Sequence, residues 1–285
     1  MYNSHKLRER RNILHSLIKF LVCISLLFIE KSFALSELPG IDKIYVISLD
    51  RTPERLQFIK RQMERFHIEF EHFHAVDGKY MKIIDMNGNE LNKMRKGSIY
   101  FIEYPKYKGA GFRFFFSEKN LTPGECGCFL SHRAIWQDIV RRNIKRAIIL
   151  EDDVTLFDNF KETLSEIVPY IPQDADVFFL DIGMNKPFAK KTYFVSAGFW
   201  LSGFLNTPSP YFAKLKKSHR VWGTHAYCIT SDSAKKLLKL TEAVTVPVDV
   251  AVINHADELN LYVSKIKLLS GGAIESEIDK LGRWK

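Results

Sequence analysis

Residues 43–76 read KIYVISLDRTPERLQFIKRQMERFHIEFEHFHAV, and this stretch decides the fold class. The segment Lys43–Leu49 is rich in β-branched and apolar residues, which predicts a buried strand. Thr52 and Pro53 predict the cap and the first turn of a helix, whose apolar residues recur at helical spacing. A second strand follows near Glu69–Val76. A strand, a helix and a strand joined by short links predict a parallel α/β sheet.

The alternation of helices and strands resumes downstream. Thr122-Pro-Gly-Glu125 predicts a capping box at the start of a helix that ends near Arg142. Further strands are expected at Arg146–Leu150, Val177–Leu180, Thr224–Thr230 and Leu261–Ser264, the last extending toward Leu269, and further helices at Asn159–Val168 and from a Ser231 cap to Leu240. There is no internal repeat and no long linker, so we expect a single catalytic domain.

Two stretches lack a clear period. Residues 78–120 predict an irregular excursion over the sheet, with a short hairpin around Asn87-Gly88. Long irregular loops in compact domains are often lids or binding loops. Residues 183–222 are rich in Gly, Pro, Phe and Tyr, and the order of their elements is not predicted.

The N-terminal segment, residues 1–36, places basic residues ahead of Phe20–Ile29, a run of ten residues that is apolar apart from Ser25. The run is shorter than the ~20 residues of a clean membrane span, but it suits the ~7–15 residues of a secretory core. A cleaved signal peptide and an uncleaved signal anchor both fit, and either places the body on the non-cytoplasmic side. An amphipathic helix on the membrane surface is a third interpretation.

The charge balance argues against a nucleic-acid-binding protein. The net charge is +9, and residues 1–36 hold six basic and two acidic residues, which leaves a mild +5 on the body. The body has no dense basic run with interleaved aromatic residues. The body cysteines, Cys126, Cys128 and Cys228, do not match a zinc knuckle or a disulfide framework, so we interpret them as small apolar residues.

The acidic triplet Glu151-Asp152-Asp153 is the strongest chemical signal. It follows a predicted apolar strand directly, and ligands of open α/β sheets bind outside the carboxyl ends of the strands. Clustered carboxylates repel one another unless a cation offsets them, and Mg²⁺ or Mn²⁺ would also hold a diphosphate. If the strand persists, Glu151 and Asp153 face one side and Asp152 faces the other. A solvated acidic turn or a cluster at a helix N-cap is the alternative.

Ser48-Leu-Asp-Arg-Thr-Pro-Glu-Arg55 suits a phosphate, because it joins a strand to a helix N-terminus. Arg51 and Arg55 add bidentate donors, and Asp50 could accept hydrogen bonds from a ribose or a base. A capped helix with a solvent-facing Asp–Arg pair is the alternative.

Three further positions are candidates. His132 shares the buried stripe of its predicted helix, where a hydrogen-bonded core role competes with ligand binding. His225, in Gly223-Thr-His-Ala-Tyr227, could bind a metal or a phosphate. Asp249, in Pro247-Val-Asp249, is a candidate general base.

Together these motifs resemble glycosyltransferase family 25, the bacterial lipopolysaccharide-type sugar transferases related to collagen galactosyltransferases. The matching words are Ile-Tyr-Val-Ile-Ser-Leu-Asp-Arg51 with Arg55, Ala-Val-Asp-Gly78, Leu-Thr-Pro-Gly-Glu-Cys-Gly-Cys128 with Ser131-His132, Ile-Leu-Glu-Asp-Asp153, Gly-Thr-His-Ala-Tyr227 and Pro-Val-Asp249. They occur in the family's order, and the resemblance covers residues 41–276, which leaves 277–285 as a tail.

The resemblance implies a GT-A-like α/β fold with a mostly parallel central sheet flanked by helices, a UDP-sugar donor such as UDP-galactose, and often Mn²⁺. It implies an inverting transfer to a glycan acceptor such as lipopolysaccharide. The metal would bind Asp153 and Glu151, with His225 as a third candidate. Asp249 would be the base, with Asp181 as its rival. The donor would contact Ser48, Asp50, Arg51, Arg55, Asp77, His132 and Thr224.

Localisation stays open at this point. An exported body conflicts with a nucleotide-sugar donor in a bacterium, because the periplasm is not expected to hold such donors. The N-terminal segment is then a membrane-surface anchor with a cytoplasmic body, or the host is eukaryotic, or the activity is altered. A catalytically inactive sugar-nucleotide or glycan-binding relative is the first alternative function. A metal-dependent phosphotransferase or nuclease is the second, but it would need a basic groove that the sequence does not indicate.

Overall fold

The computed structural model describes residues 38–85, 87–91, 99–103, 112–115, 121–182, 209–216 and 223–272. The predicted signal or anchor segment, the tail at 277–285, the boundary at 276 and most of 183–222 lie outside these ranges, so those predictions stay untested. Among the described residues, no helix is both long enough and apolar enough to cross a membrane.

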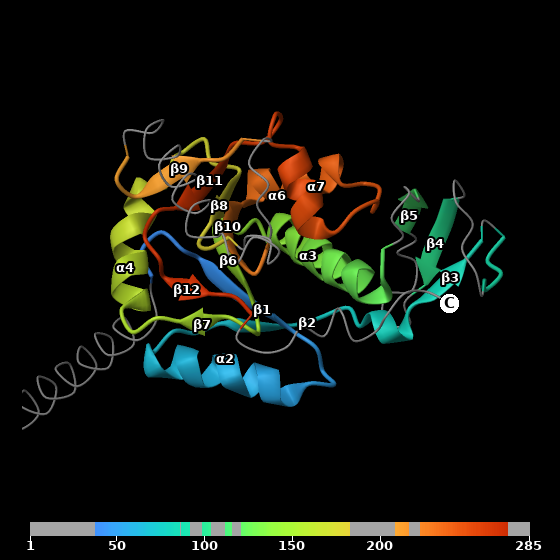
Figure 1. Cartoon of the computed structure of the whole chain (residues 1–285), viewed down its shortest axis with the longest axis horizontal. Helices are drawn as coiled ribbons and strands as arrows, with labels where there is room; N and C mark the ends of the chain where they lie inside the picture. The colour runs from blue at the N-terminus through green and yellow to red at the C-terminus, as the bar shows by residue number, and fades with distance from the viewer. Residues whose placement is uncertain are drawn as a thin grey trace, which may run out of the picture. The chain divides into compact units, whose positions relative to one another are not determined.

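A seven-stranded sheet forms the centre of the domain (Figure 1). Its strands, in spatial order, are β2 (Glu71–His74), β1 (Lys43–Ser48), β6 (Arg146–Glu151), β10 (Ala226–Thr230), β8 (Val177–Phe179), β11 (Leu261–Ser264) and β9 (Phe212–Lys214). β10 is antiparallel to both of its neighbours and β9 is antiparallel to β11, whereas the other ladders are parallel. Five strands therefore run in one direction, which confirms the predicted α/β class with a mostly parallel sheet.

Helices cover both faces of this sheet. The helices are α2 (Pro53–Arg65), α3 (Pro123–Arg141), α4 (Phe160–Ile167), α6 (Ser231–Leu240) and α7 (Val248–Asn254). Alternate residues of β1 enter different cores: Tyr45 and Ile47 pack with the apolar residues of α3, α6 and α7, whereas Ile44 and Val46 pack with those of α2 and α4. Figure 1 shows α2 and α3 on opposite sides of β1. The period of two residues in a strand thus produces three layers.

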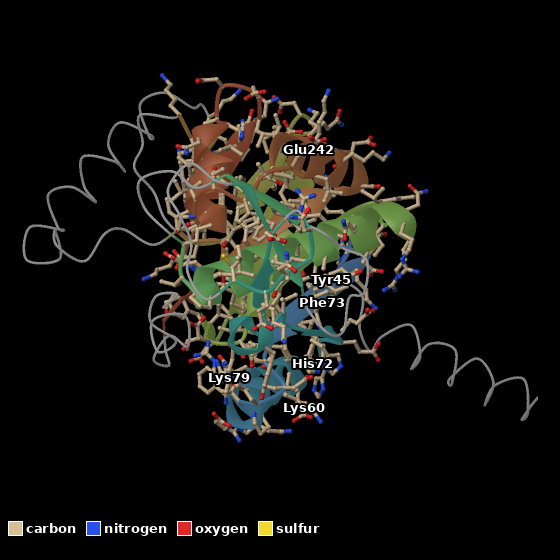
Figure 2. The ribbon with its side chains drawn as sticks, turned by 90° about the vertical axis from the view of Figure 1, so that its right-hand side faces the viewer. Tyr45, Lys60, His72, Phe73, Lys79 and Glu242 are labelled. Atoms are coloured by element: carbon tan, nitrogen blue, oxygen red, sulfur yellow. The ribbon has the colours of Figure 1, made fainter. Side chains whose placement is uncertain are left out.

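The predicted strand–helix–strand unit is present. β1 pairs in parallel with β2, and Ser48 lies opposite His74. Tyr45 and Phe73, from the two strands, lie next to each other in Figure 2, with ring centroids 6.4 Å apart. The C-terminal ends of β1 and β2 therefore lie side by side, and the connection from β1 to α2 starts there.

Residues 78–120 are more regular than predicted. They contain a 3-10 helix, η1 (Gly78–Tyr80), and an antiparallel sheet of β3 (Lys82–Ile84), β4 (Ile99–Glu103) and β5 (Phe112–Phe115). These strands pair over long gaps in the sequence, which a search for local periodicity does not detect. The predicted turn at Asn87-Gly88 is confirmed, since Ile84 bridges Glu90 and Gly88 has a φ of 83°.

Two of the three predicted helix caps lie at their predicted residues, and the third is displaced by one residue. In α3, the Glu125 amide donates to Thr122 Oγ1 and the Thr122 amide donates to the Glu125 carboxylate, which completes the capping box. Thr52 is the N-cap residue of α2 and Pro53 lies in its first turn, as predicted, but the Thr52 hydroxyl donates to the Leu49 carbonyl and makes no cap hydrogen bond. Thr230, one residue before the predicted Ser231, caps α6 by accepting the Ser233 amide hydrogen.

The last strand also differs from its prediction. β11 ends at Ser264, where the side chain donates to the Ile266 carbonyl and turns the chain. Leu269–Ser270 forms a separate strand, β12, which pairs with β7 (Thr155–Leu156) just after the acidic triplet. This ladder places Gly271 against the ring of His225, where an added Cβ would lie 2.8 Å from a ring carbon.

Candidate functional site

A pocket opens where β1 and β6 end. Its polar wall consists of Ser48, Arg51, Arg55, Asp77, Ser131, His132 and the triplet Glu151–Asp153. The first turn of α2, the segment after β2 and the first half of α3 supply the remaining wall. Because ligands of open α/β sheets bind at the carboxyl ends of the strands, this pocket is the candidate active site.

The α3 wall approaches the segment after β2 closely because both carry glycine. A Cβ on Gly127 would lie 2.4 Å from the Val76 carbonyl oxygen, and one on Gly78 would lie 2.0 Å from the Pro123 carbonyl oxygen. Ser131 holds the contact, since its hydroxyl accepts the Val76 amide hydrogen at 2.8 Å and donates to the Gly127 carbonyl at 2.7 Å. No side chain fits between these backbones, so the two glycines fix this side of the pocket.

The acidic triplet divides between the two layers. Glu151 faces α3, where His132 Nε2 lies 3.5 Å from its carboxylate, and Asp152 faces α2, where Arg55 Nη2 lies 2.6 Å from Asp152 Oδ1. The alternation expected for a strand that continues through the triplet therefore holds for these two residues. The Asp152 partner is the buried Arg55 guanidinium.

Asp153 has an oxygen that nothing in the described part of the chain satisfies. Its Oδ2 lies 3.4 Å from Arg55 Nη2, but its buried Oδ1 has no hydrogen-bond partner there. Burial and the neighbouring charge of Glu151 raise the pKa of Asp153 to about 6, against the opposing effect of Arg55. A single buried arginine among three carboxylates leaves an excess of negative charge, which a divalent cation would offset. The residues present therefore fit a metal ion.

Glu151 is held from both sides. Its amide donates to the His225 carbonyl at 2.8 Å. Burial raises the pKa of its carboxyl, but the charge of His132, which approaches to 3.5 Å, and the charges of His225 and Arg55 outweigh burial and lower it below its ordinary value. A lowered pKa favours the ionised carboxylate, which is the form that binds a metal.

His132 belongs to a buried polar chain. Its Nδ1 lies 2.8 Å from Tyr227 Oη, which also accepts the Trp136 indole hydrogen at 2.9 Å. The phenol can donate to Nδ1 or accept from it, so the ring is held in either tautomer. All three side chains are buried. Sequence reasoning missed Tyr227 and Trp136, although Trp136 lies four residues after His132 on the same helix face.

The side of the pocket between β1 and α2 carries donors that the sequence predicts to bind a phosphate. Arg51 Nε donates to Asp77 Oδ2 at 2.8 Å, and Asp77 Oδ1 accepts the Lys79 amide hydrogen at 3.0 Å. Ser48 Oγ is buried in the wall and has no hydrogen-bond partner in the described ranges. The pocket thus brings together an arginine and a hydroxyl at the end of β1 and a carboxylate after β2, a set that suits a phosphorylated ribose.

Five predicted residues lie outside this wall. Asp50 is exposed and pairs with His74 Nδ1 at 2.5 Å, and Asp181 pairs with His225 Nε2 at 3.2 Å. Thr224 is buried beyond the lining residues. Burial lowers the pKa of the His225 imidazole, but Asp181 and Glu151 outweigh that effect and raise it.

Asp249 also stands back from the pocket wall. It lies in the first turn of α7, a short helix that was not predicted, and it accepts the Gly223 amide hydrogen at 3.0 Å and the Val250 amide hydrogen at 2.8 Å. Burial and the charge of Glu151 raise its pKa, against the lowering by these amides.

A mostly parallel sheet with carboxylates at the end of β6 and arginines at the start of α2 is consistent with a Rossmann-like α/β glycosyltransferase domain. The sequence profile of glycosyltransferase family 25 (LPS biosynthesis protein) matches residues 41–252. The chain belongs to this family, as its motifs predicted.

Three curated relatives illustrate the range of the family. "Glycosyltransferase 25 family member" of Drosophila melanogaster is 35% identical over 129 residues, which are 45% of this chain and 19% of the relative. "Procollagen galactosyltransferase 2" of Homo sapiens is 26% identical over 200 residues, 70% of this chain and 28% of the relative. "Inactive glycosyltransferase 25 family member 3" of Mus musculus is 33% identical over 129 residues, which are 45% of this chain and 19% of the relative. The chain spans less than a third of these proteins.

Proposed function

We propose that this protein transfers a hexose, with galactose as the first candidate, from a UDP-sugar to a glycan acceptor such as lipopolysaccharide. Family membership supports a sugar transferase, and the human relative is named for galactose transfer. The family description names lipopolysaccharide biosynthesis, which supports the acceptor class. The observation that carries the proposal is the buried, unpartnered Asp153 oxygen beside a pocket lined by Arg51 and Asp77.

Asp153 and Glu151 would hold Mn²⁺ or Mg²⁺, with His225 as a further candidate near Glu151. Such an ion would stabilise the negative charge that develops on the leaving diphosphate. Arg51 would bind the phosphates beside the α2 N-terminus, and Asp77 would orient the arginine through their 2.8 Å contact. Arg55 would hold Asp152 in place, so we assign it to the metal side of the pocket as a positioning residue.

Asp249 is the proposed base, and Asp181 is its rival. An inverting transfer needs one displacement at the anomeric carbon, with a carboxylate that accepts the acceptor hydroxyl proton. The raised pKa of Asp249 supports this role, because a carboxylate of higher pKa is a stronger base. Asp181 is engaged with His225. We expect Asp249→Asn to lower kcat more than Asp181→Asn, with circular dichroism to show that both variants fold; the reverse order would reassign the base.

Residues 1–36 are proposed to bring the protein to a membrane or to export it. The three interpretations differ in what they predict. A signal peptide predicts an exported body and cleavage, a signal anchor predicts an exported body without cleavage, and a surface helix predicts a cytoplasmic body. Protease treatment of intact and lysed cells separates a cytoplasmic from an exported body, and the mass of the mature chain shows whether the segment is cleaved.

A catalytically inactive binding protein is the second candidate function, and the inactive mouse relative favours it. Both candidates predict that UDP binds, but only a transferase releases UDP from a UDP-sugar. Titration calorimetry with UDP and a coupled assay of UDP release therefore separate them. Binding without release, across UDP-galactose and other UDP-hexoses with Mn²⁺ present, would replace the transferase proposal with the inactive one.

A further inference from the structure

Three different metal-ligand types meet on the α3 side of the pocket. Cys128, His132 and Glu151 each offer one ligand atom, and these atoms lie within 4.8 Å of one another. Cys128 and His132 are four residues apart on α3, so their side chains lie one above the other on the same helix face. Glu151 reaches them from the end of β6.

The His132 ring is prepared for a ligand. It is fully buried, and its Nε2 has no hydrogen-bond partner within the described ranges apart from the 3.5 Å approach of Glu151. Its other nitrogen is fixed by Tyr227 Oη at 2.8 Å. Histidines that bind metals almost always donate their second ring N–H to such an outer partner, which orients the ring. A buried nitrogen aimed at a thiol and a carboxylate is costly unless it binds something.

The number and type of the ligands point to one class of ion. A thiolate, an imidazole and a carboxylate suit Zn²⁺ and its relatives Co²⁺ and Cd²⁺, whereas Mg²⁺ prefers oxygen alone. Zinc bonds of about 2.0–2.3 Å require ligand atoms about 3.3–3.8 Å apart. His132 Nε2 and Glu151 Oε1 already lie 3.5 Å apart, and a pair at the 4.8 Å limit of the set would close by roughly 1 Å. Glu151 can supply this movement, since its side chain is 23% exposed. All three residues line the pocket, which leaves a fourth position for water or substrate.

We propose that Cys128, His132 and Glu151 form a second, zinc-type metal site beside the Asp153 carboxylate. Binding forms a metal–sulfur bond and releases the Cys128 thiol proton to solvent, with no change in oxidation state. Because Glu151 belongs to both ligand sets, an ion bound to Cys128 and His132 draws Glu151 away from Asp153. Zn²⁺ then inhibits Mn²⁺-supported transfer, a consequence that rests on the proposed function.

Titration of the full-length protein with Co²⁺ tests the site directly. Cobalt bound to a thiolate produces a charge-transfer absorption in the near ultraviolet. This absorption can be observed without a nucleotide and without turnover. The matched control is Cys126→Ser, because Cys126 lies two residues away on α3, is buried in the core and does not line the pocket. We expect the band in the wild type and in Cys126→Ser, and its loss in Cys128→Ser.

Two results would overturn the proposal: no cobalt–thiolate band in the wild type, or a band that persists in Cys128→Ser. If Cys128→Ser does not fold, His132→Gln decides, with an expected loss of at least tenfold in Co²⁺ affinity; unchanged affinity counts against the site. These readouts are independent of UDP-sugar turnover. A cobalt band in a protein that never releases UDP would therefore reject the proposed function and keep the metal site.

Discussion

Replacing Asp153 by asparagine should make the metal-free protein more stable. The carboxylate is buried, faces the charge of Glu151 and leaves one oxygen without a partner in the described part of the chain. Asparagine has nearly the same shape but carries no charge. If Asp153 serves metal binding and not stability, its replacement should raise the stability of the metal-free protein and lower its activity.

The magnitude follows from the pKa of Asp153. Folding raises that pKa from 3.8 to about 6, so the folded protein binds a proton that the unfolded chain has already lost. Stability therefore falls as the pH rises through this window, and the full loss is present above it. At about 1.36 kcal/mol per pKa unit, the loss is on the order of 3 kcal/mol at pH 7.5 and about 1 kcal/mol at pH 4.5.

Urea unfolding in EDTA at both pH values measures the effect. We expect Asp153→Asn to exceed the wild type in free energy of unfolding by about 3 kcal/mol at pH 7.5 and by about 1 kcal/mol at pH 4.5. Asp158→Asn is the control, because this exposed side chain pairs only with the exposed Arg65 among the described contacts. A variant less stable than the wild type at pH 7.5, or a difference independent of pH, would refute the reasoning.

Three other substitutions probe the frame of the pocket, each by urea unfolding. Arg55→Met leaves Asp152 buried without its partner and should cost about 3–5 kcal/mol. Gly127→Ala should cost about 2 kcal/mol, because its Cβ would meet the Val76 carbonyl at 2.4 Å, although helix propensity alone predicts a gain of about 1 kcal/mol. Tyr227→Phe removes the hydroxyl shared by two buried polar groups and should cost about 2–4 kcal/mol.

Each substitution has a control of a similar kind at a residue that is exposed or whose side chain has one exposed hydrogen-bond partner. Arg65→Met, on the same helix as Arg55, breaks an ion pair between exposed side chains and should change little. Gln137→Ala is on the exposed side of α3 and should leave stability nearly unchanged. Tyr262→Phe breaks a bond to the exposed Asp174 and should cost at most about 1 kcal/mol. If a variant and its control change the free energy of unfolding equally, the contact named for that variant does not stabilise the fold.

Local signals predicted the frame well. Three features depend on residues that are adjacent in the sequence, and each is confirmed. They are the apolar run of β1, the Thr122–Glu125 capping box and the position of β6 at the triplet. The antiparallel direction of β10 and the β3–β5 sheet depend on partners far away in the chain. No periodicity in a short window can report such pairing.

The site was predictable in its residue types and less so in its pairings. Strand alternation separates Glu151 from Asp152, and this inference matches their contacts with α3 and α2. That Arg55 would be the partner of Asp152 could not be read from the sequence, since the two residues are 97 positions apart. The link from Trp136 through Tyr227 to His132 needs α3 to lie across β10, which is a property of the packed layers.

The central claim is that Asp153 supports metal-dependent sugar transfer. The most direct test is UDP release from UDP-galactose, measured with Mn²⁺ and with EDTA for the wild type, Asp153→Ala and the exposed control Asp158→Ala. We predict Mn²⁺-dependent release in the wild type and in Asp158→Ala, and loss of the Mn²⁺-dependent part in Asp153→Ala. Turnover by Asp153→Ala that matches the wild type, with the same response to Mn²⁺, would contradict the account.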